Sequence, residues 1–270
     1  MNERRYRTGR GVSGIKTLVV EASPRREGNS ITIARSFMRG LRDGGETEIK
    51  ERFLNDMEVR PCLGCWKCLE MREPGCVIDD DMTEVYPELM EADLIIFATP
   101  IYWWHIAGQM KVFLDRMEGL LAGNGPNNLS GKALVLIVTH LVEDPDGVEL
   151  AIRTFRSITG WAGMSLDVIR YYSADDHVSE REEKLDEAYR LGRSYAGWEA
   201  PELIFKCMVE NCVGMFSSVE SLARHLAAAA GLNHRTWRSD HGLQDRGMAD
   251  DELWNQIASI LKDESTPKDR

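Results

Sequence analysis

The sequence predicts an α/β domain in which helices cover both faces of a five-stranded, doubly wound parallel sheet. Short apolar runs rich in β-branched residues alternate five times with amphipathic segments of helix length over the first 200 residues. Uniformly apolar strands are typical of parallel sheets that are buried on both faces. Five strands in this rhythm favour the order 2-1-3-4-5, in which ligands bind beyond the carboxyl ends of strands one and three.

The first strand is predicted over residues 15–22, where the segment IKTLVVEA is short and apolar. A helix follows at 31–42, because Ile33, Phe37 and Leu41 share one face and two glycines come after it. The remaining strands are expected over residues 47–54, 93–98, 133–139 and 165–171, and the remaining helices over 82–90, 107–121, 148–159, 180–198 and 250–262.

Charge and composition exclude several classes of protein. The net charge is -11, and an acidic chain is repelled by nucleic acid and by anionic membranes, so we expect neither as a partner. No apolar run reaches the roughly 20 residues that a membrane-spanning helix needs. The four arginines before residue 14 are not followed by the apolar segment of a signal peptide, which predicts a cytoplasmic protein. Six cysteines in a reducing compartment indicate metal or redox chemistry before disulfides.

We therefore expect three parts. Residues 1–14 form a mobile basic arm, residues 15–199 the α/β domain, and residues 200–270 a small C-terminal appendage, because the strand–helix rhythm stops near residue 200.

The strongest chemical signal is the sequence SPRREGNS at residues 23–30, between the first strand and the first helix. The hydroxyls of Ser23 and Ser30, the amide of Asn29 and the guanidinium of Arg25 are all donors that a phosphate accepts. Gly28 permits close backbone approach, and the following helix points its free N–H groups into the loop. The alternative is an ordinary strand-to-helix turn in which Asn29 is the N-cap.

This loop resembles the FMN phosphate loop of the flavodoxin-like NAD(P)H-dependent FMN reductases, which include multimeric flavodoxins and iron–sulfur flavoproteins. Ala22 stands where that family usually has glycine. The resemblance implies a flavodoxin-like fold, FMN as the cofactor and NAD(P)H as the reductant. It also implies that the phosphate contacts Ser23, Arg25, Gly28, Asn29 and Ser30.

The sequence TPIYWW at residues 99–104 follows the third strand. Aromatic and aliphatic walls with nearby backbone donors suit a flavin ring, although the same residues could form a core or subunit-contact patch. With the downstream MKxFxDR motif, the segment is similar to the second FMN segment of the family. The resemblance implies that the isoalloxazine ring contacts Pro100, Ile101, Tyr102 and Trp103, with Thr139 and His140 after the fourth strand as further candidates. We expect Lys111, Asp115 and Arg116 to be structural, in ion pairs or a subunit contact.

Four cysteines, Cys62, Cys65, Cys68 and Cys76, lie in one loop between the second strand and the next helix. Thiolates at such spacings can hold one 4Fe–4S cluster, and the pattern resembles the compact cysteine motif of the iron–sulfur flavoproteins. A zinc site and a set of structural or redox thiols are the alternatives.

The appendage carries Cys207, Cys212 and His225 at a spacing that resembles a C2H2 zinc finger. The second histidine is absent from its usual place, and His234 comes later. The predicted appendage is therefore a zinc site of these four residues or a degenerate finger without metal.

Together these patterns predict an FMN-dependent oxidoreductase that moves electrons from NAD(P)H to a quinone, a flavin or a similar small acceptor. The resemblance implies a homodimer or homotetramer. One alternative is an iron–sulfur flavoprotein electron carrier that a ferredoxin-like partner reduces. The other is a redox-sensing or scaffold protein that binds a partner through the finger.

Overall fold

The computed structural model describes most of the first 199 residues and short pieces beyond residue 204. The described ranges are 14–45, 47–71, 74–121, 128–141, 145–173, 176–199, 205–206, 215–216, 222–223, 255–261 and the single residues 226, 238, 240 and 243. The predicted zinc ligands Cys207, Cys212, His225 and His234 lie outside these residues.

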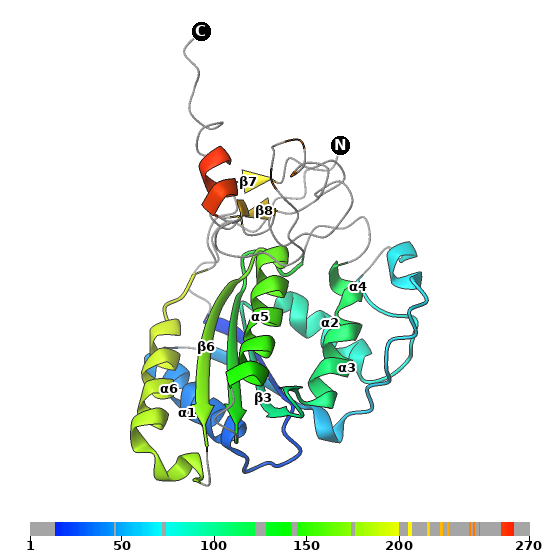
Figure 1. Cartoon of the computed structure of the whole chain (residues 1–270). Coiled ribbons are helices and arrows are strands. Elements are labelled where there is room, and N and C mark those ends of the chain that lie inside the picture. Colours follow the sequence, from blue (N-terminus) through cyan, green and yellow to red (C-terminus); the bar gives the residue numbers. More distant parts are fainter. Residues whose placement is uncertain are drawn as a thin grey trace.

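The centre of the molecule is a parallel sheet whose strands follow the order β2-β1-β3-β5-β6 (Figure 1). This confirms the predicted order 2-1-3-4-5, because the extra strand β4 only pairs with the end of β3. The strands are β1 (Ile15–Glu21), β2 (Thr47–Phe53), β3 (Leu94–Tyr102), β4 (His105–Ile106), β5 (Ala133–His140) and β6 (Ser165–Tyr172). All eight residues of β5 are buried, as a central strand covered on both faces requires.

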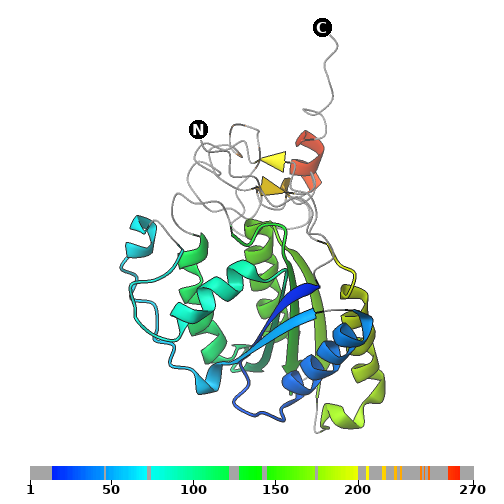
Figure 2. The same cartoon turned by 180° about the vertical axis from the view of Figure 1, so that it is seen from behind.

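Helices cover both faces of this sheet. Figure 2 shows α1 (Asn29–Gly44) beside α6 (Glu182–Tyr195), and their apolar residues pack with one core cluster. The other face packs against α2 (Met82–Glu91), α3 (Gly108–Arg116) and α5 (Pro145–Ala162). The shorter helical segments are η1 (Leu54–Asp56), η2 (Lys67–Glu70), α4 (Glu118–Leu121) and η3 (Val178–Glu180).

Two expected boundaries were wrong. The third strand does not end at residue 98 but continues to Tyr102 and folds back as β4, because Ile101 pairs with the buried Ile106. The helix expected over 107–121 is divided at Met117, a turn residue between α3 and α4.

Beyond residue 204, Phe205–Lys206 (β7) and Met215–Phe216 (β8) pair as an antiparallel ladder, and residues 255–261 are helical. In the described part of the chain no helix has the length and apolarity to cross a membrane.

Candidate functional site

The carboxyl ends of β1 and β3 lie side by side in the sheet. Glu21 is in register with Ala98, and the amide of Ala22 donates to the carbonyl of Ala98 at 2.9 Å. The loop over residues 23–28 leaves β1 at this edge, and the aromatic end of β3 leaves from the neighbouring strand. The two segments predicted to bind phosphate and flavin are therefore adjacent at the switch point of the sheet.

The loop over residues 23–28 is held by short-range hydrogen bonds. Ser23 Oγ accepts from the amide of Arg25 at 3.1 Å and donates to its carbonyl at 3.2 Å. The amide of Gly28 donates to the same carbonyl at 3.0 Å. Gly28 is the N-cap residue of α1, so no side chain occupies the first N–H groups of that helix.

Two features show that this loop fits a phosphate group. Ser30 Oγ is buried and has no hydrogen-bond partner within the described part of the chain, which is costly unless a ligand or water supplies one. A Cβ added at Gly28 would lie 2.8 Å from Ser23 Oγ, so glycine keeps the cradle open. An anion at the N-terminus of α1 would accept from the Ser30 hydroxyl and from the free amides.

The side chain of Asn29 bonds to a distant segment of the chain. Its Oδ1 accepts from the amide of Val178 at 2.9 Å, so it ties the start of η3 to the loop and does not cap its own helix. His177 Nε2 also contacts the carbonyl of Glu27 at 2.7 Å. The segment before α6 thus braces the loop, a role that the sequence pattern did not indicate.

A buried carboxyl lies immediately before the loop. Glu21 is only 7% exposed, and burial, followed by repulsion from Glu51, raises its pKa to about 7. The positive charges of Arg35 and Arg26 oppose this rise. Glu21 therefore titrates near neutral pH, two residues before the candidate phosphate loop.

The aromatic segment is the tip of a β-hairpin. Trp103 and Trp104 are its two central residues, with φ values of 48° and 63°, the left-handed conformation of a two-residue type I′ turn. This conformation is rare for bulky residues and is found where surrounding structure enforces it. Trp103 is 90% exposed and Tyr102 is also exposed, so the hairpin presents aromatic surface beside the loop. Pro100 and Ile101 are half-buried beneath it.

Thr139 and His140 end β5 and are both buried. His140 Nε2 accepts from Arg170 Nε at 3.3 Å, and its ring lies 5.4 Å from that of Tyr172. Arg170 also pairs with Glu149 at 2.9 Å. Arg170 was missed by sequence reasoning, because it lies on the next strand and only the sheet brings it to His140.

The four cysteines lie on one segment, and no disulfide joins them. Cys62 and Cys65 are exposed, whereas Cys68 and Cys76 are half-buried. Burial, then the charges of Glu118 and Cys76, raise the pKa of Cys68. No three metal-ligating side chains of the described residues are gathered closely enough to hold a metal ion, so the cluster stays a prediction.

Comparison with known proteins fits this geometry. Residues 15–165 match the family described as NADPH-dependent FMN reductase. The chain belongs to this family. The match spans β1, the loop over residues 23–28, the cysteine segment, the hairpin and β5, so the two candidate FMN segments and the four cysteines from Cys62 to Cys76 fall within it.

Two iron–sulfur flavoproteins of Methanocaldococcus jannaschii are similar to this member of the family. One is 35% identical over 123 residues, which are 45% of this chain and 62% of the relative. The other is 32% identical over 140 residues, which are 52% of this chain and 68% of the relative. The chain thus spans less than two thirds of the first relative and just over two thirds of the second.

A NAD(P)H:quinone oxidoreductase from Methanothermobacter marburgensis has the same fold. Its superposition has a TM-score of 0.54 and covers 69% of this chain and all of the other, with 19% identity. At that identity the likeness supports the fold alone.

Proposed function

We propose that the chain binds FMN at the carboxyl edge of the sheet and passes electrons from NAD(P)H to a quinone, a flavin or a similar small acceptor. The observation that carries the proposal is the buried hydroxyl of Ser30, which has no partner among the described residues, in a cradle kept open by Gly28. It lies at the start of a 16-residue helix, beside an exposed aromatic hairpin. A phosphomonoester joined to a flat aromatic ring is the ligand that matches this pairing.

In this arrangement Arg25 and Ser30 hold the phosphate, Ser23 joins them by turning its hydroxyl proton from the Arg25 carbonyl to the ligand, and Gly28 gives it room. Asn29 holds the loop through Val178 and keeps its amide N–H₂ for the ligand. The ring rests against Pro100, Ile101, Tyr102 and Trp103, with Thr139 and His140 at its other side. FMN itself supplies the hydride and electron chemistry, while the protein orients it and limits access of water.

Ser30→Ala tests the phosphate site sharply. The hydroxyl is buried and bonds to none of the residues that the structure describes, so its removal should leave the free protein as stable as before or slightly more stable. A hydrogen bond to a charged group contributes about 1.5–3 kcal/mol, so the affinity for FMN should fall roughly 10- to 100-fold. Riboflavin lacks the phosphate, and its affinity should not change.

Arg25→Ala is the companion variant, because Arg25 is exposed and lies outside the core. It should also weaken FMN more than riboflavin, measured by quenching of flavin fluorescence. Equal losses for both ligands in the two variants would show that this loop does not hold the phosphate.

A second candidate function is that of an iron–sulfur flavoprotein. Four free thiols on one segment and the names of the two archaeal relatives favour it. Anaerobically purified protein would then contain about four iron and four sulfide per chain. It would be reduced faster by a ferredoxin-like protein than by NAD(P)H. Absence of iron together with rapid NAD(P)H oxidation would reject this candidate in favour of the first.

A further inference from the structure

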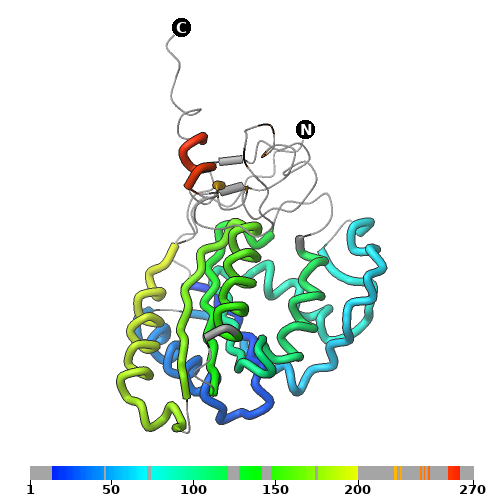
Figure 3. The backbone as a smooth tube through the Cα atoms, in the orientation of Figure 1, coloured from blue at the N-terminus to red at the C-terminus, as the bar shows by residue number. Residues whose placement is uncertain are grey.

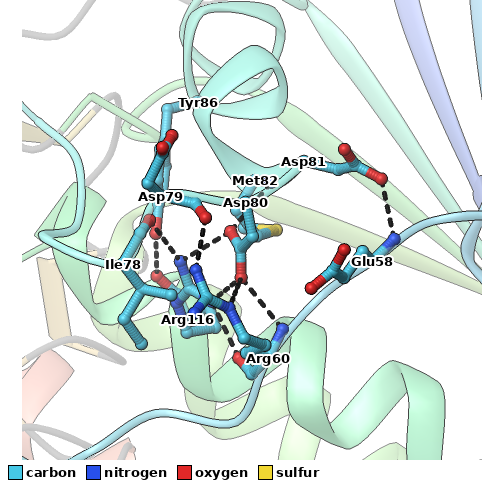
Figure 4. A network of polar contacts seen from close by, with 9 residues as sticks. All are labelled: Glu58, Arg60, Ile78, Asp79, Asp80, Asp81, Met82, Tyr86 and Arg116. Atoms are coloured by element: carbon cyan, nitrogen blue, oxygen red, sulfur yellow. Dashed lines mark hydrogen bonds and ion pairs between the residues drawn. The ribbon is translucent and has the colours of Figure 1, made fainter.

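We propose that the ion pair between Arg116 and Asp80 is a positioning device that fixes the two ends of the cysteine loop, here defined as the described residues 60–71 and 74–80. The proposal goes beyond the flavin site, and it does not depend on whether the thiols bind a cluster. Figure 3 shows this segment following the outside of α3 and α4. Figure 4 shows Arg116 reaching from the end of α3 into the gap between the two ends of the loop.

The pair is buried and bidentate. Arg116 Nη1 lies 2.6 Å from Asp80 Oδ2, and Nη2 lies 3.0 Å from Oδ1. Both side chains are 0% exposed. Burial raises the pKa of Asp80, but hydrogen bonds from Arg116 and from the Arg60 amide outweigh it and leave that pKa below its usual value. The pair is therefore ionised at neutral pH.

The same two side chains join both ends of the loop. Asp80 Oδ2 accepts from the amide of Arg60 at 2.9 Å, and Arg116 Nη1 donates to the carbonyl of Arg60 at 2.7 Å. Asp81, the next residue, extends this contact: its Oδ2 accepts from the amide of Glu58, two residues before Arg60, at 2.7 Å. The chain thus leaves and returns through a neck closed by charge-assisted hydrogen bonds.

A second anchor holds the returning arm of the loop. The amide of Gly75 donates to the carbonyl of Gly119 at 3.3 Å. A Cβ at Gly119 would lie 2.2 Å from the carbonyl oxygen of Gly75, so the two backbones touch directly. Cys76 follows this anchor at once, and Ile78, two residues later, accepts from Arg116 Nη2 at 3.5 Å. Cys76 therefore lies between two restrained residues, Gly75 and Ile78.

Stability alone does not explain such a pair. Desolvation of two buried charges offsets much of their attraction, and apolar pairs of similar volume are often as stable. An apolar pair cannot form directional hydrogen bonds, so it cannot hold the Arg60 amide and carbonyl at defined positions. The specific consequence of the ion pair is therefore that the segment entering the loop at Arg60 and the segment leaving it at Asp80 are held at fixed positions relative to each other. This also fixes the position of Cys76.

The test replaces both charges at once with Asp80→Leu/Arg116→Met, which leaves no lone buried charge. Arg52→Met/Glu88→Leu is the matched control, because it removes a bidentate pair between β2 and α2 that does not touch the loop. Each protein is treated with a chelator so that bound metal does not shield thiols. Alkylation of each cysteine by iodoacetamide is then followed by mass spectrometry.

We expect the double variant to keep its fold and its affinity for FMN, while Cys76 is alkylated about tenfold faster or more, because the neck opens locally. The control should label at the wild-type rate. A folded double variant with wild-type labelling of Cys76 would overturn the proposal.

Hydrogen exchange of the wild-type protein gives a second test if the double variant does not fold. The amides of Arg60 and Met82 donate to Asp80, and they should exchange at least about tenfold more slowly than the exposed amides of Leu63 and Cys65. Equal exchange rates at the four positions would refute a closed neck.

Discussion

Replacement of Glu21 by glutamine should change how stability depends on pH. Glu21 ends β1 on the face of the sheet that α1 covers, since Val19, two residues earlier, packs in that core cluster. Burial and then Glu51 raise its pKa from 4.5 to about 7. The folded protein therefore holds a proton that the unfolded chain releases above pH 4.5. The stability from this proton is fully present below pH 4.5 and is lost as the pH rises through 7.

The size of the effect follows from the shift. A rise from 4.5 to about 7 corresponds to about 3 kcal/mol as an upper bound, at 1.36 kcal/mol per pH unit. Residual hydration of the carboxyl lowers the expected value to about 1–3 kcal/mol. Glu21→Gln keeps the volume of the side chain and removes its titration. The variant should match the wild type most closely near pH 5 and be more stable by this amount at pH 8.

Urea unfolding of both flavin-free proteins from pH 5 to pH 8 measures the difference. Glu51→Gln is the control, because it removes the repulsion but leaves Glu21 able to titrate, so the pH dependence should become shallower without vanishing. If the stability difference between Glu21→Gln and wild type is the same at pH 5 and pH 8, Glu21 does not titrate in this range and the reasoning fails.

Two glycine substitutions test the cradle and the second anchor. Gly28→Ala is compatible with the local φ of -72° but fills the space next to Ser23 Oγ, so FMN affinity should fall at least about tenfold. Gly108→Ala, with nothing within 4 Å of the added Cβ, should bind FMN normally in the same fluorescence titration. Gly119→Ala places a methyl group against Gly75. It should speed alkylation of Cys76 while the Arg116–Asp80 ion pair stays in place. Unchanged labelling would show that the glycine contact does not restrain the loop.

The three inner strands β1, β3 and β5 could be predicted because burial on both faces demands continuous apolar sequence, whereas the edge strands β2 and β6 are mostly half-buried or exposed. The segment ALVLIVT, for example, has no polar residue before its last position, and a central parallel strand is the structure that suits it. The loop over residues 23–30 could also be singled out as a candidate site, since its possible donors Ser23, Arg25, Asn29 and Ser30 all lie within that short segment. Ser30 and Gly28 need only the strand and helix on either side to bring them together.

The aromatic hairpin could not be predicted, because its turn contradicts local preference. Type I′ turns favour asparagine and glycine, whereas here two tryptophans adopt positive φ. Tertiary contacts enforce the turn instead. The amide of Ala107 donates to Thr99 Oγ1 at 3.2 Å, and a Cβ at Gly147 would lie only 2.9 Å from the Cα of Trp104. The first contact closes the base of the hairpin itself, whereas Gly147 lies in α5, a segment that the sequence pattern does not place beside residues 103–104.

The partner of Arg116 was hidden for the same reason. The sequence indicated ion pairing in the MKxFxDR motif, and Lys111 does pair with Asp115 one turn away. Asp80, however, lies 36 residues before Arg116, and local spacing says nothing about a contact at that separation. The three aspartates at 79–81 resemble the start of a helix. This pattern gives no sign that Asp80 forms a buried ion pair.

The helix α3 explains why the flavin site and the cysteine loop can be tested separately. It begins just after the hairpin and ends at Arg116, and nine residues at 1.5 Å each separate its ends by about 13 Å. Met110 and Phe113 are fully buried in the core on this face, so packing holds the helix in place even when the ion pair is removed. Loss of the pair should therefore release the loop without moving the hairpin. A variant that loses FMN affinity and thiol protection together would mean that α3 depends on Arg116 for its position, and the two sites would then be one mechanical unit.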